Sequence, residues 1–285
     1  MKIKAYAKIN IGLDVIRKRE DGYHEVRMIM QNIDLYDELV VEKTDKDIII
    51  TTDSSELPVN EDNLIYKAAK LFLSEHGSDF GVRISLKKNI PVAAGLAGGS
   101  TDAAATLLAL NSISGTDLSI EELSKIGVRI GADVPYCIMG GTVLSEGIGE
   151  ILTPIAKCPK IRILLAKPPV GVSTAFVYNN LRLDTVSHPD IDAIIDAIGR
   201  SDVKAMCSGL GNVLESVTIP ANPVISDIKN IMTDNGALGA LMSGSGPSVF
   251  GVFESDEDIQ KAYDVLSSSG LVKDLFMTWT VDPDR

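Results

Sequence analysis

The sequence is poor in cysteine and histidine. Its three cysteines are far apart, odd in number and in no C-x-x-C spacing, and its three histidines share no metal-ligand spacing. A disulfide framework and a zinc or other histidine-based metal site are therefore not expected. We interpret the cysteines as small buried hydrophobic residues. The residues concerned are Cys137, Cys158, Cys207, His24, His76 and His188.

Long apolar runs are also missing. No stretch approaches the roughly 18 uninterrupted apolar residues that a membrane-spanning helix needs. The first ten residues, MKIKAYAKIN, alternate in polarity instead of forming the apolar core of a signal peptide. We expect a cytoplasmic protein with no membrane partner.

Basic residues are fewer than acidic ones. The chain has 27 lysines and arginines against 39 aspartates and glutamates, a formal net charge of −12. Such a chain repels the backbone of nucleic acid, and short basic patches at residues 17–19 and 87–88 do not offset this. We therefore expect no nucleic-acid partner. An anionic small molecule would have to be met locally, by a few lysines and by backbone N–H groups at glycine-rich loops.

The first half of the chain alternates in a way that predicts a sheet. The period-two pattern of residues 3–15 predicts a half-buried strand, with Lys8 and Asn10 on the face opposite the core side chains. Extended runs at residues 26–43 and 47–52 predict an antiparallel sheet. A helix over residues 63–77, closed by Gly77, and a strand over residues 82–88 should follow.

The second half reads as a separate α+β unit. Prolines at 154, 159, 168 and 169 surround a buried strand at residues 161–167, so we place a domain boundary near residue 156. The expected domains are residues 1–156 and 157–285. The second should contain helices near 189–199 and 222–235, and strands within 236–253.

A loop of small residues is the strongest local signal. Residues 91–104 read PVAAGLAGGSTDAA and enter a predicted helix. Gly95, Gly98 and Gly99 leave room for close backbone approach, and the free N–H groups of a helix N-terminus attract anions. The loop therefore predicts a phosphate site, with a purely structural loop as the alternative. It follows neither the G-x-x-x-x-G-K-[ST] nor the G-x-G-x-x-G pattern.

Two further segments combine small residues with polar ones. In GADVP, residues 131–135, Asp133 follows a predicted capped helix that Gly131 should close, and Pro135 predicts an extended or turn conformation there. Its carboxylate is either fixed for catalysis or caps a turn. Residues 241–250, LMSGSGPSVF, read as a hairpin turn.

These segments together resemble the superfamily of galactokinase, homoserine kinase, mevalonate kinase and phosphomevalonate kinase, the GHMP kinases. Residues 91–104 are similar to its phosphate loop, P-x-x-x-G-L-x-G-G-S-[ST]-[DN]-A-A, except that Ala97 stands where members commonly have glycine. The G-A-D-V-P and G-S-G-P strings match its other motifs. Within the superfamily, A-K-I-N at 7–10, D-G-Y-H at 21–24 and M-Q-x-I-D at 30–34 resemble the diphosphocytidyl-methylerythritol kinases.

The resemblance implies a fold and an activity. The fold is α+β, with an N-terminal domain like the second domain of ribosomal protein S5, a ferredoxin-like C-terminal domain and a site in the cleft between them. The activity is ATP-dependent phosphorylation of the 2-hydroxyl of a cytidine diphosphate-linked alcohol, a step of the methylerythritol phosphate route to isoprenoid precursors. ATP and Mg²⁺ are the implied cofactors.

The resemblance also implies roles for individual residues. Asp133 is the catalytic base that contacts the substrate hydroxyl, and Lys8 offsets negative charge on the transferred group. The remaining implied substrate contacts are Asn10, Tyr23, His24, Tyr178, Gly244 and Ser245, with Tyr178 preferred to Phe176 as the ring against cytosine. The implied phosphate-loop contacts to ATP are Pro91, Val92, Ala93, Ala94, Gly95, Leu96, Ala97, Gly98, Gly99, Ser100 and Thr101. Ser100 is the one candidate for a Mg²⁺ ligand.

Two other functions stay open at this point. Another GHMP kinase, acting on homoserine or a mevalonate, would share the loop and Asp133 but should lack the D-G-Y-H segment. A catalytically silent ligand sensor on the same fold would not need both Lys8 and Asp133. Competition by cytidine nucleotides and ATP turnover separate these alternatives.

Overall fold

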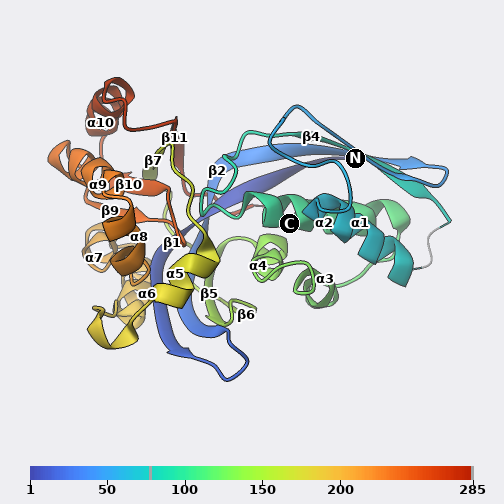
Figure 1. Ribbon diagram of the computed structural model, residues 1–285, viewed down its shortest axis with the longest axis horizontal. Helices are drawn as coiled ribbons and strands as arrows, with labels where there is room; N and C mark the ends of the chain where they lie inside the picture. The colour runs from blue at the N-terminus through green and yellow to red at the C-terminus, as the bar shows by residue number, and fades with distance from the viewer. Residues whose placement is uncertain (77–78, 284–285) are drawn as a thin grey trace.

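Two β-sheets with covering helices make up residues 1–76 and 79–283, the part of the chain that the computed structural model describes (Figure 1). The first sheet has the strand order β3-β4-β2-β1-β8, and β5 and β6 extend it from β2. Its strands are β1 (Lys2–Lys18), β2 (His24–Thr44), β3 (Ile48–Thr52), β4 (Gly81–Lys87), β5 (Thr142–Gly147), β6 (Ile151–Pro154) and β8 (Gly211–Asn212).

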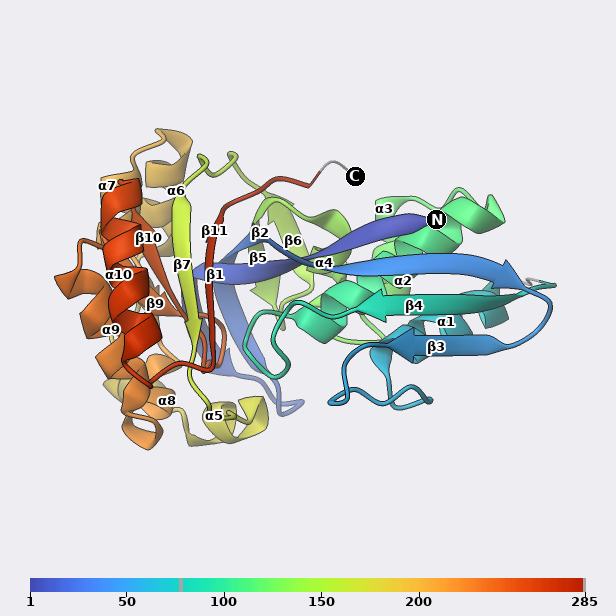
Figure 2. The same cartoon turned by 90° about the horizontal axis from the view of Figure 1, so that it is seen from above.

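Helices cover one face of this sheet (Figure 2). They are α1 (Leu64–Glu75), α2 (Gly98–Ser114), α3 (Ile120–Gly127) and α4 (Val134–Met139). Helix α2 contacts both β1 and β2, and α1 packs beside it. Helix α3 begins with the expected capping box, in which the Ser119 side chain and Glu122 satisfy each other's backbone N–H groups.

The second sheet has the order β11-β7-β10-β9 and is antiparallel. Its strands are β7 (Arg162–Lys167), β9 (Gly239–Met242), β10 (Val249–Phe253) and β11 (Asp274–Trp279). The helices of this part are α5 (Thr174–Asn180), the 3₁₀ turn η1 (Leu183–Thr185), α6 (Ile191–Gly199), α7 (Val203–Ser208), α8 (Glu215–Ala221), α9 (Val224–Asp234) and α10 (Asp256–Ser268). The expected α+β class is confirmed, and so are the helices near 189–199 and 222–235.

Strand β1 differs from the prediction of a half-buried strand. Its residues from Ala7 to Val15 are buried on both faces, Lys8 and Asn10 included. Its pairing with β2 shifts register between Tyr6 and Lys8 and again between Asn10 and Gly12. At the first shift β2 has two more residues than β1 between the flanking pairs, and at the second shift β1 has one more residue than β2. A single extra residue reverses which face the next side chains of its strand occupy.

The apolar side chains of β1 are divided between two cores. One cluster contains Leu13 and Val15, together with residues of α1 and α2. Ala7, Ile9 and Ile11 belong to a second cluster, together with residues of β7, α6 and β10. The strand therefore packs against both halves of the molecule, and this explains why it has no solvent face.

Two local expectations are corrected. Strand β3 pairs parallel with β4, although an antiparallel sheet was expected. Helix α3 ends at Gly127 instead of continuing to Gly131. The turn conformation expected before Pro135 is confirmed, because residues 132 and 133 form a turn directly before α4; a proline at the first turn of a helix costs no intrahelical hydrogen bond. Gly77, expected to close α1, lies outside the described residues.

The expected boundary between residues 156 and 157 falls in the connection from β6 to β7, and we keep it as a proposal. The second half of the chain also contributes to the first sheet, because β8 pairs with β1 and Thr280 bridges to Ile33. In the described part of the chain, no helix is both long and apolar enough to cross a membrane.

Candidate active site

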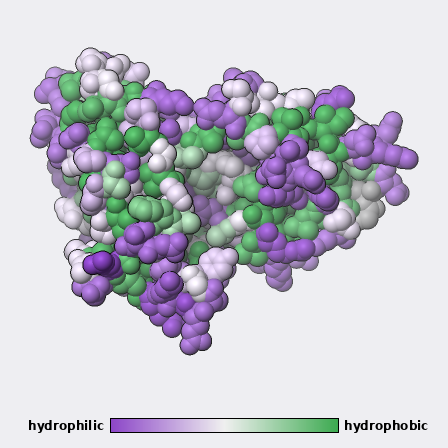
Figure 3. Space-filling view, viewed as in Figure 1, coloured by the Kyte–Doolittle hydropathy of each residue, from purple (hydrophilic) through white to green (hydrophobic). Residues whose placement is uncertain are grey.

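A cavity of about 640 Å³ lies where the two halves of the chain meet. Figure 3 shows the surface hollowed between them. Its walls come from β1, β2, the phosphate loop, the segment before α4, α5 and the turn after β9. The structure thereby brings together residues that were singled out from sequence: Lys8, Asn10, Tyr23, His24, Gly95, Ala97, Ser100, Asp133, Tyr178, Gly244 and Ser245.

A second cavity of about 350 Å³ lies on the other side of the phosphate loop. It shares Gly95, Ala97 and Ser100 with the first cavity. The other loop residues that line it are Pro91, Val92, Ala93, Ala94, Gly98 and Gly99. Two of the expected loop residues line neither cavity: Leu96 and Thr101 are each 1% exposed.

The phosphate loop takes a left-handed backbone at alternate residues. The φ angles are 51° at Ala93, 74° at Gly95 and 58° at Ala97. Ala97 immediately precedes α2 and makes no side-chain cap, so its side chain leaves the first N–H groups of this helix uncapped. The alanine that departs from the family pattern thus adopts the conformation that glycine favours, at a cost of about 1–2 kcal/mol.

Gly95 packs against the turn after β9, residues 243–248. A Cβ added at Gly95 would overlap the carbonyl oxygen of Ser243. The Ser243 hydroxyl donates to the Gly95 carbonyl at 3.0 Å. The Lys8 N–H donates to the Leu96 carbonyl at 3.2 Å. The two glycine-rich segments and β1 are therefore held as one unit.

Lys8 is the buried cation of the larger cavity. Only 4% of the residue is exposed, and its Nζ donates to Asn10 Oδ1 at 2.8 Å. The same Nζ lies 3.9 Å from Asp133 Oδ2. Asn10 in turn donates from Nδ2 to the Met28 sulfur at 3.3 Å. Asn10 therefore fixes the lysine beside the carboxylate.

The Asp133 carboxylate does not cap the helix that follows it. Asp133 occupies the N-cap position of α4, but its side chain makes no cap hydrogen bond. Its side chain is 32% exposed and lines the larger cavity. No cap hydrogen bond therefore supports the alternative that the Asp133 carboxylate caps a turn.

The far end of the larger cavity is aromatic. His24 and Tyr178 lie with ring centroids 5.1 Å apart at an angle of 40°. Burial lowers the pKa of His24, with a further contribution from Lys18, and burial raises the pKa of Tyr178. Both rings are therefore favoured in their neutral forms. Tyr23 is 60% exposed at the rim, and Phe176, 52% exposed, does not line the cavity.

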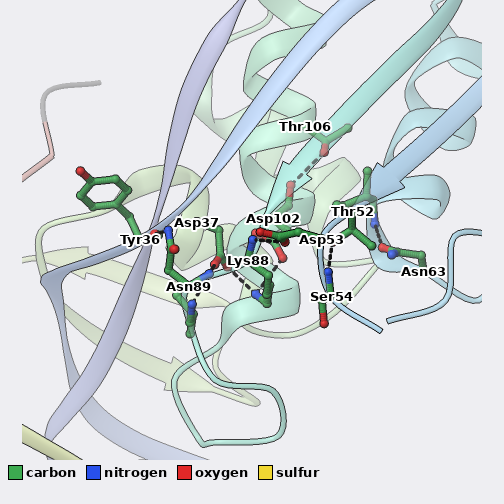
Figure 4. Close-up of polar contacts among 12 residues, drawn as sticks. Tyr36, Asp37, Thr52, Asp53, Ser54, Asn63, Lys88, Asn89, Asp102 and Thr106 are labelled. Carbon is green, nitrogen blue, oxygen red and sulfur yellow. Dashed lines mark hydrogen bonds and ion pairs between the residues drawn. The ribbon is translucent and has the colours of Figure 1, made fainter. Parts of the chain in front are cut away.

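Sequence reasoning missed a buried ion cluster beneath the phosphate loop (Figure 4). Lys88 Nζ pairs with Asp37 and lies 3.0 Å from Asp102 on α2. Asp37 Oδ1 also accepts the N–H groups of Asn89 and Ile90 at 2.6 and 2.8 Å. Burial raises the pKa of Asp102 to about 8, although Lys88 opposes the shift. The cluster fastens the start of the loop to both β2 and α2.

Protein-family models match both halves of the chain. The model described as GHMP kinases N terminal domain matches residues 63–141, and that described as GHMP kinases C terminal matches residues 190–271.

Curated proteins match over their full length. A 4-diphosphocytidyl-2-C-methyl-D-erythritol kinase of Lachnoclostridium phytofermentans is 51% identical over 280 residues, covering 98% of this chain and 96% of that protein. One of Clostridium perfringens is 48% identical over 287 residues, covering 100% of both.

Solved structures match as well. A crystal structure of 4-(cytidine 5′-diphospho)-2C-methyl-D-erythritol kinase has a TM-score of 0.84 and 33% identity, covering 99% of this chain and 100% of that one. Homoserine kinase from Cytophaga hutchinsonii has a TM-score of 0.79 at 22% identity, covering 99% of this chain and 94% of that one, and shares the fold.

Proposed function

This chain belongs to the GHMP kinases and, within them, to the 4-diphosphocytidyl-2-C-methyl-D-erythritol kinases, and from that premise we propose its reaction. It is an ATP-dependent kinase of a small-molecule alcohol. The proposed acceptor is the 2-hydroxyl of 4-diphosphocytidyl-2-C-methyl-D-erythritol, in the methylerythritol phosphate route to isoprenoid precursors. One observation carries the proposal: a single cavity is lined by the Lys8–Asp133 pair, by the phosphate loop and by the rings of Tyr23, His24 and Tyr178.

Phosphoryl transfer asks the protein for alignment and for stabilisation of charge. ATP is proposed to lie across the phosphate loop, with its phosphates at the N-terminus of α2, whose N–H groups attract anions. The smaller cavity, on the outer side of this loop, would hold the nucleoside. This places the terminal phosphate near Gly95 and Ser100, which line both cavities.

Asp133 is proposed to accept the proton of the acceptor hydroxyl as that oxygen attacks the terminal phosphate. Its side chain faces the cavity and is free of a helix-capping bond. Lys8, 3.9 Å away and held by Asn10, would offset negative charge on the transferred group. We assign to Asn10 the positioning of Lys8 in addition to a substrate contact.

The aromatic end is proposed to bind cytosine. The neutral rings of His24 and Tyr178, tilted by 40° to each other, each offer a face for a base, and Tyr23 at the rim would cover the base. The distance between this end and Lys8 would then select an acceptor with a diphosphate spacer.

Magnesium is proposed to arrive on the ATP phosphates. Mg²⁺ prefers oxygen ligands and is usually held by one or two protein groups together with substrate phosphates. Among the described residues, no group of three or more His, Cys, Asp or Glu side chains could hold a metal, whereas Ser100 brings a hydroxyl to both cavities. These residues fit an ion that takes one protein oxygen, Ser100 Oγ. The ion would offset phosphate charge.

A product assay tests the proposal. The protein is incubated with ATP, Mg²⁺ and, separately, the diphosphocytidyl alcohol, homoserine and mevalonate. We expect phosphate only on the first acceptor, and phosphorus NMR of the product should place it on the 2-hydroxyl. Phosphorylation of homoserine or mevalonate instead would replace the proposed substrate, and absence of ATP turnover with every acceptor would refute catalysis.

A further inference from the structure

The turn after β9, residues 243–248, is held from behind by a segment that sequence analysis did not single out. This segment begins with β8, which pairs parallel with β1 at Gly12 and Leu13. It continues into α8, which lies against the same turn. Its central residue is Asn212, which is 7% exposed and does not line the larger cavity.

The side-chain amide of Asn212 makes three hydrogen bonds to backbone. Nδ2 donates to the carbonyls of Met242 and Gly244, each at 2.8 Å. Oδ1 accepts the N–H of Leu214 at 3.0 Å. Because donor and acceptor sides are both engaged, the orientation of the amide is fixed.

Because Asn212 fixes the Gly244 carbonyl, it also fixes the orientation of the N–H of the following residue, Ser245. The C=O and N–H of one trans peptide point in opposite directions. The carbonyl oxygen of the Gly244–Ser245 peptide points toward Asn212, outside the cavity. The N–H of the same peptide, that of Ser245, therefore points in the opposite direction, toward the cavity that Gly244 and Ser245 line. Among the described residues, no hydrogen bond uses the N–H of Gly244 or Ser245.

Gly244, at the other end of the same peptide, lies close to Lys8 and Gly95. A Cβ added at Gly244 would be 3.2 Å from the Gly95 carbonyl and 3.5 Å from Lys8 Nζ. Gly244 has a φ of 57°, in the left-handed region that glycine adopts without strain. A phosphate oxygen at this place would meet a lysine and a fixed backbone donor.

We propose that Asn212 is a positioning residue for phosphoryl transfer, because it turns the Gly244–Ser245 peptide so that the Ser245 N–H donates to a phosphate oxygen beside Lys8. The inference deepens the proposed function and rests on it. The phosphate belongs either to the nucleotide or to the diphosphate of the acceptor, and the two differ in the experiment below.

A purely structural role for Asn212 is the competing explanation. Thr218 provides the matched control, since its hydroxyl donates to the next carbonyl of the same turn, Ser245 O, at 3.2 Å, and it is 1% exposed. Thr218→Val keeps the shape and removes this bond without releasing the Gly244 carbonyl. Asn212→Asp keeps the shape and the acceptor for Leu214, but sets a carboxylate oxygen against two carbonyls.

The first measurement is steady-state kinetics with melting curves. We expect Asn212→Asp to lower kcat by about 10²-fold, the typical effect of losing one fixed donor to developing charge, with the KM for ATP changed by at most about threefold. Thr218→Val should lower kcat by no more than about threefold, even if it melts at a similar temperature to Asn212→Asp. Wild-type kcat in Asn212→Asp, or equal kcat losses in both variants, would overturn the proposal.

The second measurement needs no variant at Asn212 and no turnover. Wild-type protein labelled with ¹⁵N-serine is titrated with adenylyl imidodiphosphate and Mg²⁺, and separately with cytidine 5′-diphosphate. The Ser245 amide signal, assigned by its loss in Ser245→Ala, should move downfield with one of these ligands, and that ligand identifies the source of the phosphate. A Ser245 signal unmoved by both, at saturation, would overturn the proposal.

The two measurements also separate this inference from the proposed function. If wild-type protein phosphorylates none of the acceptors, the function fails, while the Ser245 titration still decides whether a phosphate meets this N–H. If wild type phosphorylates the diphosphocytidyl alcohol and Ser245 stays unmoved, only the role of Asn212 fails.

Discussion

The two ends of the larger cavity are built in different ways. At the phosphate end, Lys8 is 4% exposed, Asn10 is fully buried, and hydrogen bonds fix the two glycine-rich segments to each other. At the aromatic end, Tyr23 is 60% exposed on a turn. Transfer requires reacting groups to be aligned before the substrate arrives, whereas a base can be covered by a ring that settles on it. Changes at the phosphate end should therefore lower kcat, and changes at the aromatic end should raise KM.

The largest effect should follow from Asp133→Asn. The variant keeps the shape but removes the proton-accepting carboxylate, so we expect kcat to fall by about 10²–10⁴-fold while affinity for both substrates changes only a few-fold. Lys8→Met should cause a similar loss, and the double variant should be little worse than either, because the pair acts as one unit. A melting curve is the control. If Asp133→Asn keeps nearly full kcat and melts like wild type, the base lies elsewhere.

A substitution at Gly95 should show how closely the phosphate loop packs against the turn of residues 243–248. Gly95→Ala puts a Cβ into the Ser243 carbonyl at a φ of 74°, and the shift needed to relieve the overlap should reduce kcat/KM by about 10²-fold. Gly115→Ala is the matched control, with a φ of 72° and open space around the new Cβ at the end of α2. It should cost about 1–2 kcal/mol of stability without altering kinetics. Equal kinetic losses in both would mean that strain, not contact between the loops, is responsible.

Changes at the aromatic end should alter KM and leave kcat unchanged. Base stacking on a ring is worth about 1–3 kcal/mol, so Tyr23→Ala should raise the KM for the cytidine-linked acceptor roughly tenfold and leave ATP binding unchanged. Phe176 is 52% exposed and lies outside the cavity lining, so Phe176→Ala should leave both constants near wild type. A loss of ATP affinity in Tyr23→Ala would instead assign this end to adenine.

The smallest effect concerns an ion pair that fastens the far part of β1 to the second half of the chain. His188 Nδ1 lies 2.7 Å from Asp14 Oδ1, and this contact raises the pKa of the histidine. A raised pKa in the folded state means that the stabilisation is complete below the unfolded value of about 6.5 and is lost as pH rises through the folded pKa.

Melting curves of wild type and His188→Gln at pH 5.5 and pH 9 test this pair. We expect wild type to be more stable than the variant at pH 5.5, by a few degrees at most because the histidine is 45% exposed, and the difference to shrink at pH 9. A difference that stays constant between the two pH values would contradict a charge effect.

The sequence predicted the class of fold and the segments that meet at the cavity, while the roles of their residues stay predictions. Short motifs predict such segments well because the chemistry that they encode is local. A run of small residues before a helix indicates a loop wherever it occurs in a chain. The double burial of β1 was missed because its pairing with β2 shifts register and leaves residues unpaired while the alternation of its letters continues unbroken. No local pattern records an unpaired residue of this kind.

Non-local polar contacts were missed for a different reason. Asp37, Lys88 and Asp102 come from three segments, and nothing in the letters around them indicates that they share one buried cluster. Asn212 lies in the sequence GNVLES, which carries no recognisable motif. Its structural role comes from hydrogen bonds to carbonyl groups 30 and 32 residues away. Hydrogen bonds from side chain to distant backbone leave no periodicity to find.

One hairpin carries both Lys8, the lysine proposed to stabilise charge, and the turn proposed to cover the base. Lys8 and Asn10 lie within β1, and Tyr23 and His24 follow the turn that joins it to β2 (Figure 1). A strand advances about 3.3 Å per residue, so lengthening both strands by two residues would move the turn outward by roughly 6.6 Å without changing which face any side chain occupies. The length of the hairpin would therefore set the distance between Lys8 and the turn, and that distance can change only in steps of two residues per strand if the side chains are to keep their faces.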